Sequence, residues 1–319
     1  MSIRITLDIF SGRNNPCWEV RDLDQERETV EDFARHQSAL GDIGSGFTGL
    51  GFRGIKVDFT SDVKIAGLPS SFELAGGGAQ DPFASAGLAD RVLDTAPHGS
   101  HDTDVTDAET KEYWLAMRAT AREEISRATR RGFTETQTFE PLYRQEDDGL
   151  AAEAEKQLRE LNQRSATCAW DAAPFQPDFW NQSSVQPYNN CYNYAVNIRT
   201  DTRAKPGRYH GFQISPWVTG SEVAAGVFKD GLNVWGTCQP EGNNRVIVAM
   251  VTGAFSTGVR DFHFYRLDIG GHWSHKMAEN MARRTDNSGI PITNPYLCDR
   301  GIYTEWNGFF QSHNSVRIK

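Results

Sequence analysis

The chain has 319 residues, with 42 acidic and 33 basic side chains and a formal net charge of −9. This length suits two domains better than one, and the apolar and charged contents are those of a globular protein. The acidic excess and the lack of a basic stripe exclude nucleic acid as a main partner. No segment approaches the roughly 18 apolar residues of a membrane span, so we expect no membrane partner either.

The charge is unevenly distributed along the chain. Residues 1–164 carry 30 acidic and 19 basic side chains, whereas residues 165–319 carry 12 and 14. Six of the eight tryptophans lie beyond residue 165, where proline, asparagine and aromatic residues also become frequent. We therefore predict a smaller, acidic α/β module over residues 1–164, ending in a connector helix, and a second domain over residues 165–319.

The N-terminal module begins with a strand pattern. In MSIRITLDIF, apolar and polar residues alternate from Ile3 to Phe10, as in a half-buried strand. The stretch SGRNNP follows and is rich in turn residues. The later predicted elements are a helix over 24–40, a strand in GFRGIKVDFT, a surface excursion over 75–101, a helix from the capping box at 106–109 to about residue 131, and a charged helix over 147–164.

The C-terminal domain shows one helical segment followed by strand patterns. The predicted elements are a helix over 189–199 and strands over 245–252, 261–267 and 272–276. Short strands in succession favour an antiparallel sheet, and the helix must bury its apolar face against it. The sequence therefore predicts an α+β class, with a helix packed on an antiparallel sheet in this half.

The N-terminus and the cysteines bear on location. The start lacks the charged region and apolar run of a signal peptide, so we expect a cytoplasmic protein, although a dedicated secretion system would leave no such signal. The five cysteines are an odd number without CxxC spacing, which indicates neither a disulfide framework nor a zinc site. The stretch HGSHDTD, with His98 and His101, lacks a second ligand cluster, so we predict no metal.

Cys191 has the most suggestive setting of the five cysteines. It lies in QPYNNCYNYAVNI, at the predicted start of a helix, where the helix dipole favours thiolate over thiol. A thiolate there, with a histidine from a neighbouring strand as general base, would form a nucleophilic site. The backbone N–H of Cys191 and the side chain of Gln186 are candidate oxyanion donors, and Asn190 competes with Gln186 for that role.

Two histidines flank a Gly-Gly turn in DFHFYRLDIGGHWSHK. A three-residue loop, Ile269–Gly271, would put His263 and His275 on one face of the hairpin, with Tyr265 directly opposite His275. A two- or four-residue loop would put them on opposite faces. We expect His263 to be the base and His275 to orient it; the alternative orienting residues are His272, Asp286 and Asn287.

This order of residues is similar to that of the NlpC-type peptidases of the papain-like superfamily, over about residues 165–280. The resemblance implies a papain-like domain with Cys191 as nucleophile, His263 as base and His275 as orienting residue. It implies a thiol-dependent hydrolase or acyl transferase that acts through a thioester on a peptide, protein or peptidoglycan-like amide, without a cofactor. The family's Asp-Cys-Ser is replaced here by Asn190-Cys191-Tyr192.

Other segments resemble proteins without an established activity. The stretches HFYR, WSHK, TDNSGIPITNP and YTEWNGFF are similar to a poorly characterised bacterial group that has relatives among molluscan shell-matrix proteins. The opening LDIFSGRNNPCW resembles a recurring N-terminal module. The alternative hypothesis is therefore a catalytically silent binding or structural protein that keeps the papain-like fold. Hydrogen-bond contact between Cys191 and His263 would distinguish the two hypotheses.

Overall fold

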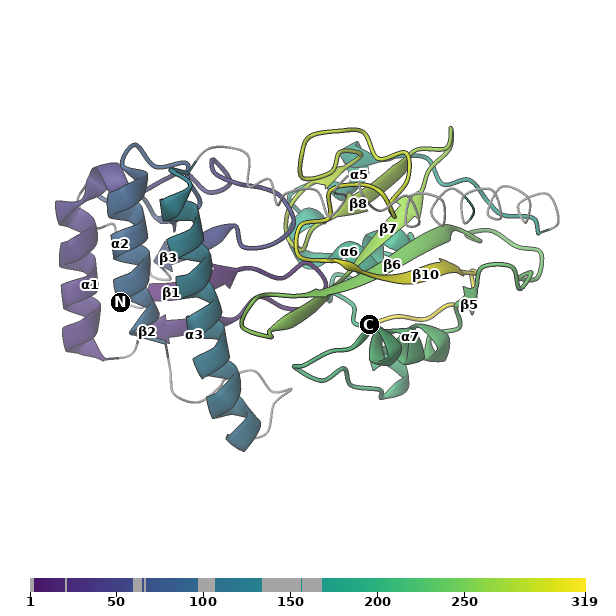
Figure 1. Cartoon of the computed structure of the whole chain (residues 1–319), viewed down its shortest axis with the longest axis horizontal. Coiled ribbons are helices and arrows are strands. Elements are labelled where there is room, and N and C mark those ends of the chain that lie inside the picture. Colours follow the sequence, from purple (N-terminus) through teal and green to yellow (C-terminus); the bar gives the residue numbers. More distant parts are fainter. Residues whose placement is uncertain are drawn as a thin grey trace. The chain divides into compact units, whose positions relative to one another are not determined.

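A computed structural model describes residues 3–20, 22–59, 65, 67–96, 107–133, 156 and 168–319. These residues form two compact units (Figure 1). The N-terminal unit comprises the described residues of Met1–Ile9, Asn15–Gln137 and Phe255–Val259, and the C-terminal unit those of Phe10–Asn14, Thr138–Ala254 and Arg260–Lys319. Helices and antiparallel sheets occur together, so the chain is an α+β protein. The boundary expected at residue 164 lies outside the described residues.

The N-terminal unit contains a four-stranded sheet of order β2-β1-β3-β4, in which every neighbouring pair is antiparallel. Its strands are β1 (Ile3–Asp8), β2 (Cys17–Val20), β3 (Gly54–Phe59) and β4 (Ser71–Leu74). The expected alternation in β1 is confirmed, because Ile3, Ile5 and Leu7 are buried. The α/β architecture expected here is wrong. That architecture has parallel strands joined by helices, whereas β3 pairs antiparallel with β1.

Three helices accompany this sheet. They are α1 (Leu23–Arg35), α2 (Pro82–Leu93) and α3 (Asp107–Arg130), with the 3-10 helix η1 (Gln37–Ala39) after α1. The Asp22 side chain caps α1 by accepting hydrogen bonds from the backbone N–H groups of Asp24 and Gln25. Helix α2 contacts α1, α3 and β4, and the three helices lie together in Figure 1.

Helix α2 corrects the surface excursion expected over residues 75–101. Asp81 caps it and Pro82 occupies its first turn, both common at helix starts. Leu88 and Val92 are buried, so the segment belongs to the core. The helix expected to reach about residue 131 is α3, which ends at Arg130 before Gly132, whose φ is +69°. Thr106 and, apart from residue 156, the predicted helix 147–164 lie outside the described residues.

The C-terminal unit contains a six-stranded antiparallel sheet of order β5-β10-β6-β7-β8-β9. Its strands are β5 (Asn233–Val234), β6 (Ile247–Ala254), β7 (Arg260–Leu267), β8 (Trp273–Lys276), β9 (Ala282–Arg283) and β10 (Glu305–Gln311). The three strands predicted from sequence correspond to β6, β7 and β8. Strand β6 is central and buried along nearly all of its length, which explains its continuous apolar run.

Short helices border this sheet. They are α5 (Pro177–Trp180), α6 (Cys191–Ala195) and α7 (Gly220–Lys229), with the 3-10 helices η2 (Gln186–Tyr188) and η3 (Arg208–His210). Helix α6 packs against β7 and β8. It is shorter than the helix expected over 189–199, because Asn197 adopts a left-handed conformation, with φ +58°, just after its end.

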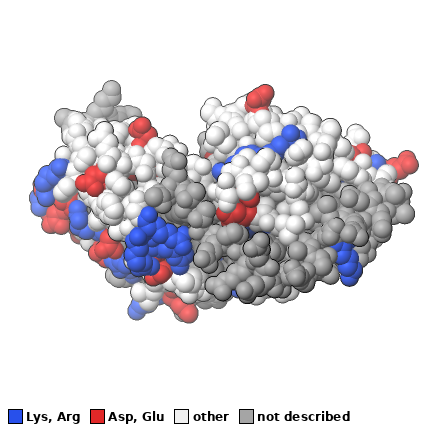
Figure 2. All heavy atoms as spheres, turned by 45° about the horizontal axis from the view of Figure 1, so that its top comes forward, with Lys and Arg blue, Asp and Glu red and all other residues white. Residues whose placement is uncertain are grey.

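Figure 2 shows one face of the molecule, on which Lys/Arg and Asp/Glu atoms are interspersed over the N-terminal unit. Ion pairs of opposite sign contribute to this pattern. Arg122 pairs with Asp90 at 2.8 Å and with Asp94 at 2.6 Å, and both carboxylates are exposed. The acidic excess of this unit is therefore partly compensated locally. No helix within the described ranges has both the length and the apolar content needed to cross a membrane.

A disulfide bond joins Cys168 to Cys238 in the C-terminal unit, across a sequence separation of 70 residues. The odd number and the spacing of the cysteines indicated no disulfide framework, and this bond corrects that expectation. Structural disulfides persist mainly in oxidising environments outside the cytosol. The bond ties the start of the described C-terminal segment to the chain that follows β5.

Removing this disulfide should destabilise the C-terminal unit. The double variant Cys168→Ser/Cys238→Ser should lose about 2–5 kcal/mol of unfolding free energy, because a loop of this size is no longer closed in the unfolded chain. Urea unfolding followed by tryptophan fluorescence would measure the change. Cys17→Ser, at an exposed position, is the matched control and should leave the midpoint unchanged. Equal midpoints for the double variant and the wild type would contradict the structural role of the bond.

Candidate functional site

The β7–β8 hairpin has the register expected from its glycines. Tyr265 pairs with His275, and the N–H of Asp268 donates to the carbonyl of His272, which leaves Ile269–Gly271 as the loop. Both loop glycines have positive φ, +90° and +82°. The three-residue loop is therefore confirmed, and it puts His263 and His275 on the same face.

The two histidines form a hydrogen bond. His263 Nε2 lies 2.8 Å from His275 Nδ1, and both side chains are fully buried. His275 Nε2 lies 3.0 Å from the backbone carbonyl oxygen of Thr285. Since that oxygen can only accept, and since it is closer than Arg283 Nε, which lies 3.5 Å from the same nitrogen, we assign the proton to Nε2. The structure thus gives His275 the expected position beside His263, and Thr285 orients His275 in turn.

Helix α6 packs on the opposite face of β7 from these histidines. The ring of Tyr192 lies 4.9 Å from that of Phe264, and Arg266 donates to the carbonyl of Tyr194 at 3.2 Å. Because successive side chains alternate along a strand, His263 and Tyr265 point away from α6. Cys191 begins α6. The helix that carries Cys191 and the ring of His263 therefore belong to different faces of the sheet.

Ser11 connects the cysteine to the histidines. Its Oγ lies 2.6 Å from His263 Nδ1, and its side chain also hydrogen bonds to the Cys191 thiol. The backbone N–H of Phe264 is the other hydrogen-bonding group at the sulfur, which places the thiol at the edge of β7. The sequence analysis missed Ser11, which lies 252 positions before His263.

Asp261 holds the Ser11 backbone in place. Its carboxylate accepts the backbone N–H of Ser11 at 2.6 Å, of Gly12 at 3.2 Å and of Arg13 at 3.2 Å. The hydroxyl of Tyr303 donates to the same carboxylate at 2.6 Å. Burial raises the pKa of Asp261, while the hydrogen bonds from Ser11 and Tyr303 act in the opposite direction.

Cys191 does not have the electrostatics of a nucleophile. Its side chain is 0 % exposed and belongs to the apolar core of the unit. Burial, and then the nearby charge of Asp261, raise the pKa of Cys191 well above its ordinary value, although the Phe264 N–H, Lys276 and Ser11 act in the opposite direction. The five-residue helix α6 therefore does not produce the thiolate expected from its dipole, because desolvation is the larger effect.

Hydrogen-bond direction is the same at each step from Ser11 to Thr285. Neutral His275 uses its Nε2 proton on Thr285, so its Nδ1 accepts from His263 Nε2–H. His263 Nδ1 then accepts from the Ser11 hydroxyl, and the Ser11 side chain also hydrogen bonds to Cys191. Burial, followed by the positive charge of Arg283, lowers the pKa of His275 to about 3. We call these four side chains the Cys–His chain; this arrangement of its protons leaves each member uncharged.

The expected oxyanion donors have other partners. The Gln186 side chain donates from Nε2 to the carbonyl of Glu279 at 2.9 Å. Asn190 caps α6 through its Oδ1 and donates from Nδ2 to the carbonyls of Gly12 at 2.9 Å and Ala204 at 2.8 Å. Both side chains therefore bind backbone groups within the unit, and the polar groups expected to face a substrate are engaged there.

The alternative orienting residues His272, Asp286 and Asn287 have other contacts. His272 is exposed in the hairpin loop. Asp286 accepts the backbone N–H groups of Ser288 and Ile290, so it stabilises a turn, and the N–H of Asn287 donates to the carbonyl of Asp299. His98 and His101 lie outside the described residues. Within the described part of the chain, no cluster of three or more His, Cys, Asp or Glu side chains could hold a metal ion.

Lys276 is a second buried group that sequence reasoning missed. Its side chain is 0 % exposed, and Nζ donates to the carbonyls of Gln186 at 2.7 Å, Asn189 at 2.5 Å and Ala278 at 2.5 Å. Three carbonyl acceptors compensate the buried ammonium. This cation therefore fixes the loop that precedes α6. A lysine flanking His275 in WSHK was the available signal, but nothing local showed that it was buried.

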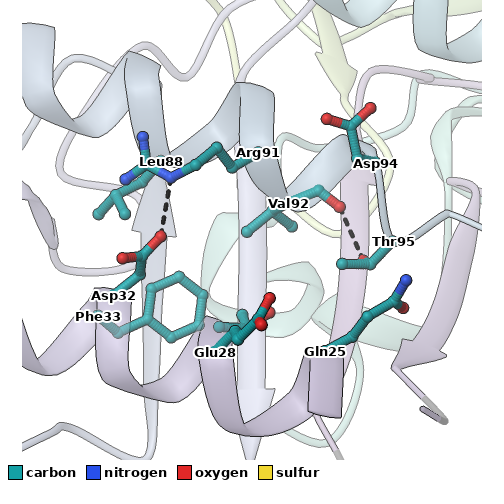
Figure 3. Close-up of a pocket in the computed structure, with 10 residues that line it drawn as sticks. Gln25, Glu28, Asp32, Phe33, Leu88, Arg91, Val92, Asp94 and Thr95 are labelled. Atoms are coloured by element: carbon teal, nitrogen blue, oxygen red, sulfur yellow. Dashed lines mark hydrogen bonds and ion pairs between the residues drawn. The ribbon is translucent and has the colours of Figure 1, made fainter.

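A pocket of about 210 Å³ lies between α1 and α2 of the N-terminal unit. Figure 3 shows Phe33, Leu88 and Val92 along it, with the ion pair of Arg91 and Asp32, 2.8 Å from Nε to Oδ2, at one end. The other lining residues are Gln25, Glu28 and Thr29 of α1, and Asp94 and Thr95, which follow α2. The lining contains no histidine or cysteine, and its charged groups include the ion pair of Arg91 and Asp32.

Comparison with known proteins adds one informative relative. No family model matches the chain, and no solved structure matches it. The insoluble matrix shell protein 1 of Ruditapes philippinarum is 44% identical over 144 residues, which are 45% of this chain and 93% of that protein. The chain belongs to the family of this matrix protein. This agrees with the relationship to molluscan shell-matrix proteins expected from the sequence segments.

Two expectations are corrected by this relationship. The interpretation as a bacterial cysteine protease is wrong, because the relative is a matrix protein of a mollusc shell. The expected cytoplasmic location is also wrong, since a protein of an insoluble shell matrix does not belong to the cytoplasm. The disulfide bond between Cys168 and Cys238 agrees with the second correction. Acyl transfer at Cys191 stays a prediction from sequence.

The Cys191 thiol should be unreactive in the native protein. Iodoacetamide at pH 7.5 should alkylate exposed Cys17 at least ~100-fold faster than Cys191, because Cys191 is buried and protonated. Peptide mass spectrometry would give both rates in one sample, and labelling in urea is the control in which both react. Native labelling of Cys191 at the rate of Cys17 would rule out the sealed arrangement.

The His–His pair should make stability depend on pH. In the unfolded chain His275 binds a proton below its ordinary pKa of 6.5, whereas in the folded protein it stays neutral down to about 3. Stability therefore falls as pH decreases through this window, by about 2 kcal/mol from this group between pH 7 and pH 5.

Urea unfolding of the wild type and His275→Gln across this pH range would isolate that contribution. The variant lacks the group, so its loss on acidification should be smaller by about that amount. Other titrating groups, such as Asp261, are common to both proteins. Parallel pH profiles would show that His275 is not held neutral in the folded protein.

Proposed function

We propose that the chain is a structural protein of an insoluble extracellular matrix, and that its C-terminal unit keeps a papain-like arrangement as a scaffold. The observation that carries this proposal is the 44% identity to a matrix shell protein over 93% of that protein. In support of the papain-like arrangement, α6 begins at Cys191 and packs on β7 and β8 of an antiparallel sheet.

The chemistry of the Cys–His chain supports a structural role. Acyl transfer needs a thiolate that a carbonyl substrate can reach, with a base beside it. Here Cys191 is fully buried and protonated, and Nδ1 of His263 is hydrogen bonded to the Ser11 hydroxyl. Each donor in the chain is already matched with an acceptor. Such a fully satisfied buried network favours one packing of the surrounding elements.

The disulfide bond supports a location outside the cytoplasm. The bond between Cys168 and Cys238 would be reduced by cytosolic thiols over time but persists in an oxidising environment. A protein that must remain folded for the lifetime of a matrix also benefits from a covalent crosslink. We therefore infer that the chain acts after export, as part of the material to which it belongs.

Fractionation of the source material tests this proposal. An antibody to the chain should detect it outside cells, in material that resists buffer and salt and dissolves only in denaturant. A cytosolic marker protein controls for cell lysis. Recovery of the chain with soluble cytosolic proteins would overturn the matrix role.

A recombinant pair separates the structural role from thiol chemistry. Wild type and Cys191→Ala, mixed with the purified insoluble fraction, should co-sediment to the same extent, because the thiol only fills the core. Loss of co-sedimentation in a folded Cys191→Ala protein would show that the thiol is required, and would contradict a purely structural Cys–His chain.

A further inference from the structure

Phe10–Asn14 is a short segment of the N-terminal sequence that packs within the C-terminal unit. Its neighbours in the chain, Met1–Ile9 and the residues from Asn15 onward, belong to the other unit. The segment is extensively bound in both backbone and side chains, as the following contacts show. Its contacts therefore resemble those of a bound peptide, although the segment is part of the same chain.

The backbone of this segment is recognised along the edge of β7. Asp261 accepts three consecutive N–H groups, those of Ser11, Gly12 and Arg13. On the acceptor side, Ala278 N–H donates to the Ser11 carbonyl at 3.2 Å, and Asn190 Nδ2 donates to the Gly12 carbonyl at 2.9 Å. Residues 11–13 form a bend whose three N–H groups converge on this carboxylate, and such charge-assisted hydrogen bonds fix the backbone in one position.

The side chains of the segment are also specified. Arg13 donates from one guanidinium nitrogen to the carbonyls of Pro216 at 2.7 Å and Arg260 at 2.9 Å. A methyl group at Gly12 would overlap the ring of Phe262 and lie 2.5 Å from its carbonyl oxygen, so only glycine fits there. Glycine is thus required at position 12, and the side chain at position 13 is held by two hydrogen bonds.

We propose that the groups around Asp261 on β7 form a peptide-binding site for a bent Ser-Gly-Arg segment, that Phe10–Asn14 occupies it within the same chain, and that this occupant closes access to Cys191 and His263. Ser11 touches both of these residues through its hydroxyl, and Asn190, which binds the Gly12 carbonyl, directly precedes Cys191. This goes beyond the proposed matrix role, because it concerns what keeps the Cys–His chain sealed.

Gly12→Ala in the full chain tests the proposal, with Gly87→Ala as the matched control. A methyl at Gly87, on α2, meets no atom closer than 3.9 Å. Two measurements are made on the native proteins: tryptic cleavage after Arg13, which reports release of the segment, and the rate of iodoacetamide labelling at Cys191. Gly12→Ala should be cleaved and should label at least ~10-fold faster than wild type. Wild type and Gly87→Ala should show neither change.

A peptide in trans provides the second test. A synthetic peptide spanning residues 7–15, added to Gly12→Ala, should slow Cys191 labelling again, whereas the same peptide with alanine in place of Gly12 should not. If Gly12→Ala does not fold, Arg13→Ala replaces it, with labelling and peptide rescue as its measurements, because it removes two hydrogen bonds without adding bulk.

Three results would overturn the proposal. One is a folded Gly12→Ala protein that is cleaved after Arg13 while Cys191 stays as unreactive as in wild type. Another is a folded variant in which the segment remains protected from trypsin and the thiol remains sealed. The third is accelerated labelling that the wild-type peptide does not slow. None of these measurements depends on matrix binding, so failure here is distinguishable from failure of the matrix role.

Discussion

The carboxylate of Asp261 lies fully buried and binds the backbone of a segment 250 positions earlier in the sequence. A buried carboxylate costs several kcal/mol unless hydrogen bonds compensate it. Here Ser11, Gly12 and Arg13 supply backbone donors and Tyr303 a hydroxyl. The position of Ser11, and with it the order of the whole Cys–His chain, follows from this one anion.

The chain of hydrogen bonds that begins at Cys191 ends at a backbone carbonyl. That ending decides its chemistry, because the carbonyl oxygen of Thr285 can only accept a hydrogen bond and so orients His275, His263 and Ser11 in turn. A carboxylate in the same place would stabilise a charged imidazole, as the third member of a catalytic triad does. The carbonyl, together with burial and Arg283, favours a neutral His275 instead. This difference supports the proposal that the Cys–His chain is structural.

Local patterns predicted much of the framework and little of the site's connections. The loop Ile269–Gly271 could be inferred because two adjacent glycines favour left-handed turns, and this gave the pairing of Tyr265 with His275. Helix α2 was missed because its alanines and glycine hide the apolar period that Leu88 and Val92 complete. Ser11 and Asp261 meet only in three dimensions, so neither stretch alone shows their contact. Desolvation of Cys191 is likewise a property of the packed core, and a helix start in the sequence carries no information about it.

The two hydrogen bonds of the Ser11 side chain restrict which residues can occupy position 11. The Ser11 hydroxyl hydrogen bonds to both His263 and Cys191, so position 11 needs a small side chain that can make two hydrogen bonds. Threonine keeps the hydroxyl group, whereas alanine would remove the hydrogen bonds of Ser11 to both His263 and Cys191. The segments FSGR, near the start, and DFHFYR, near residue 261, are therefore coupled through these contacts. In related sequences, we expect substitutions in one segment to be accompanied by substitutions in the other.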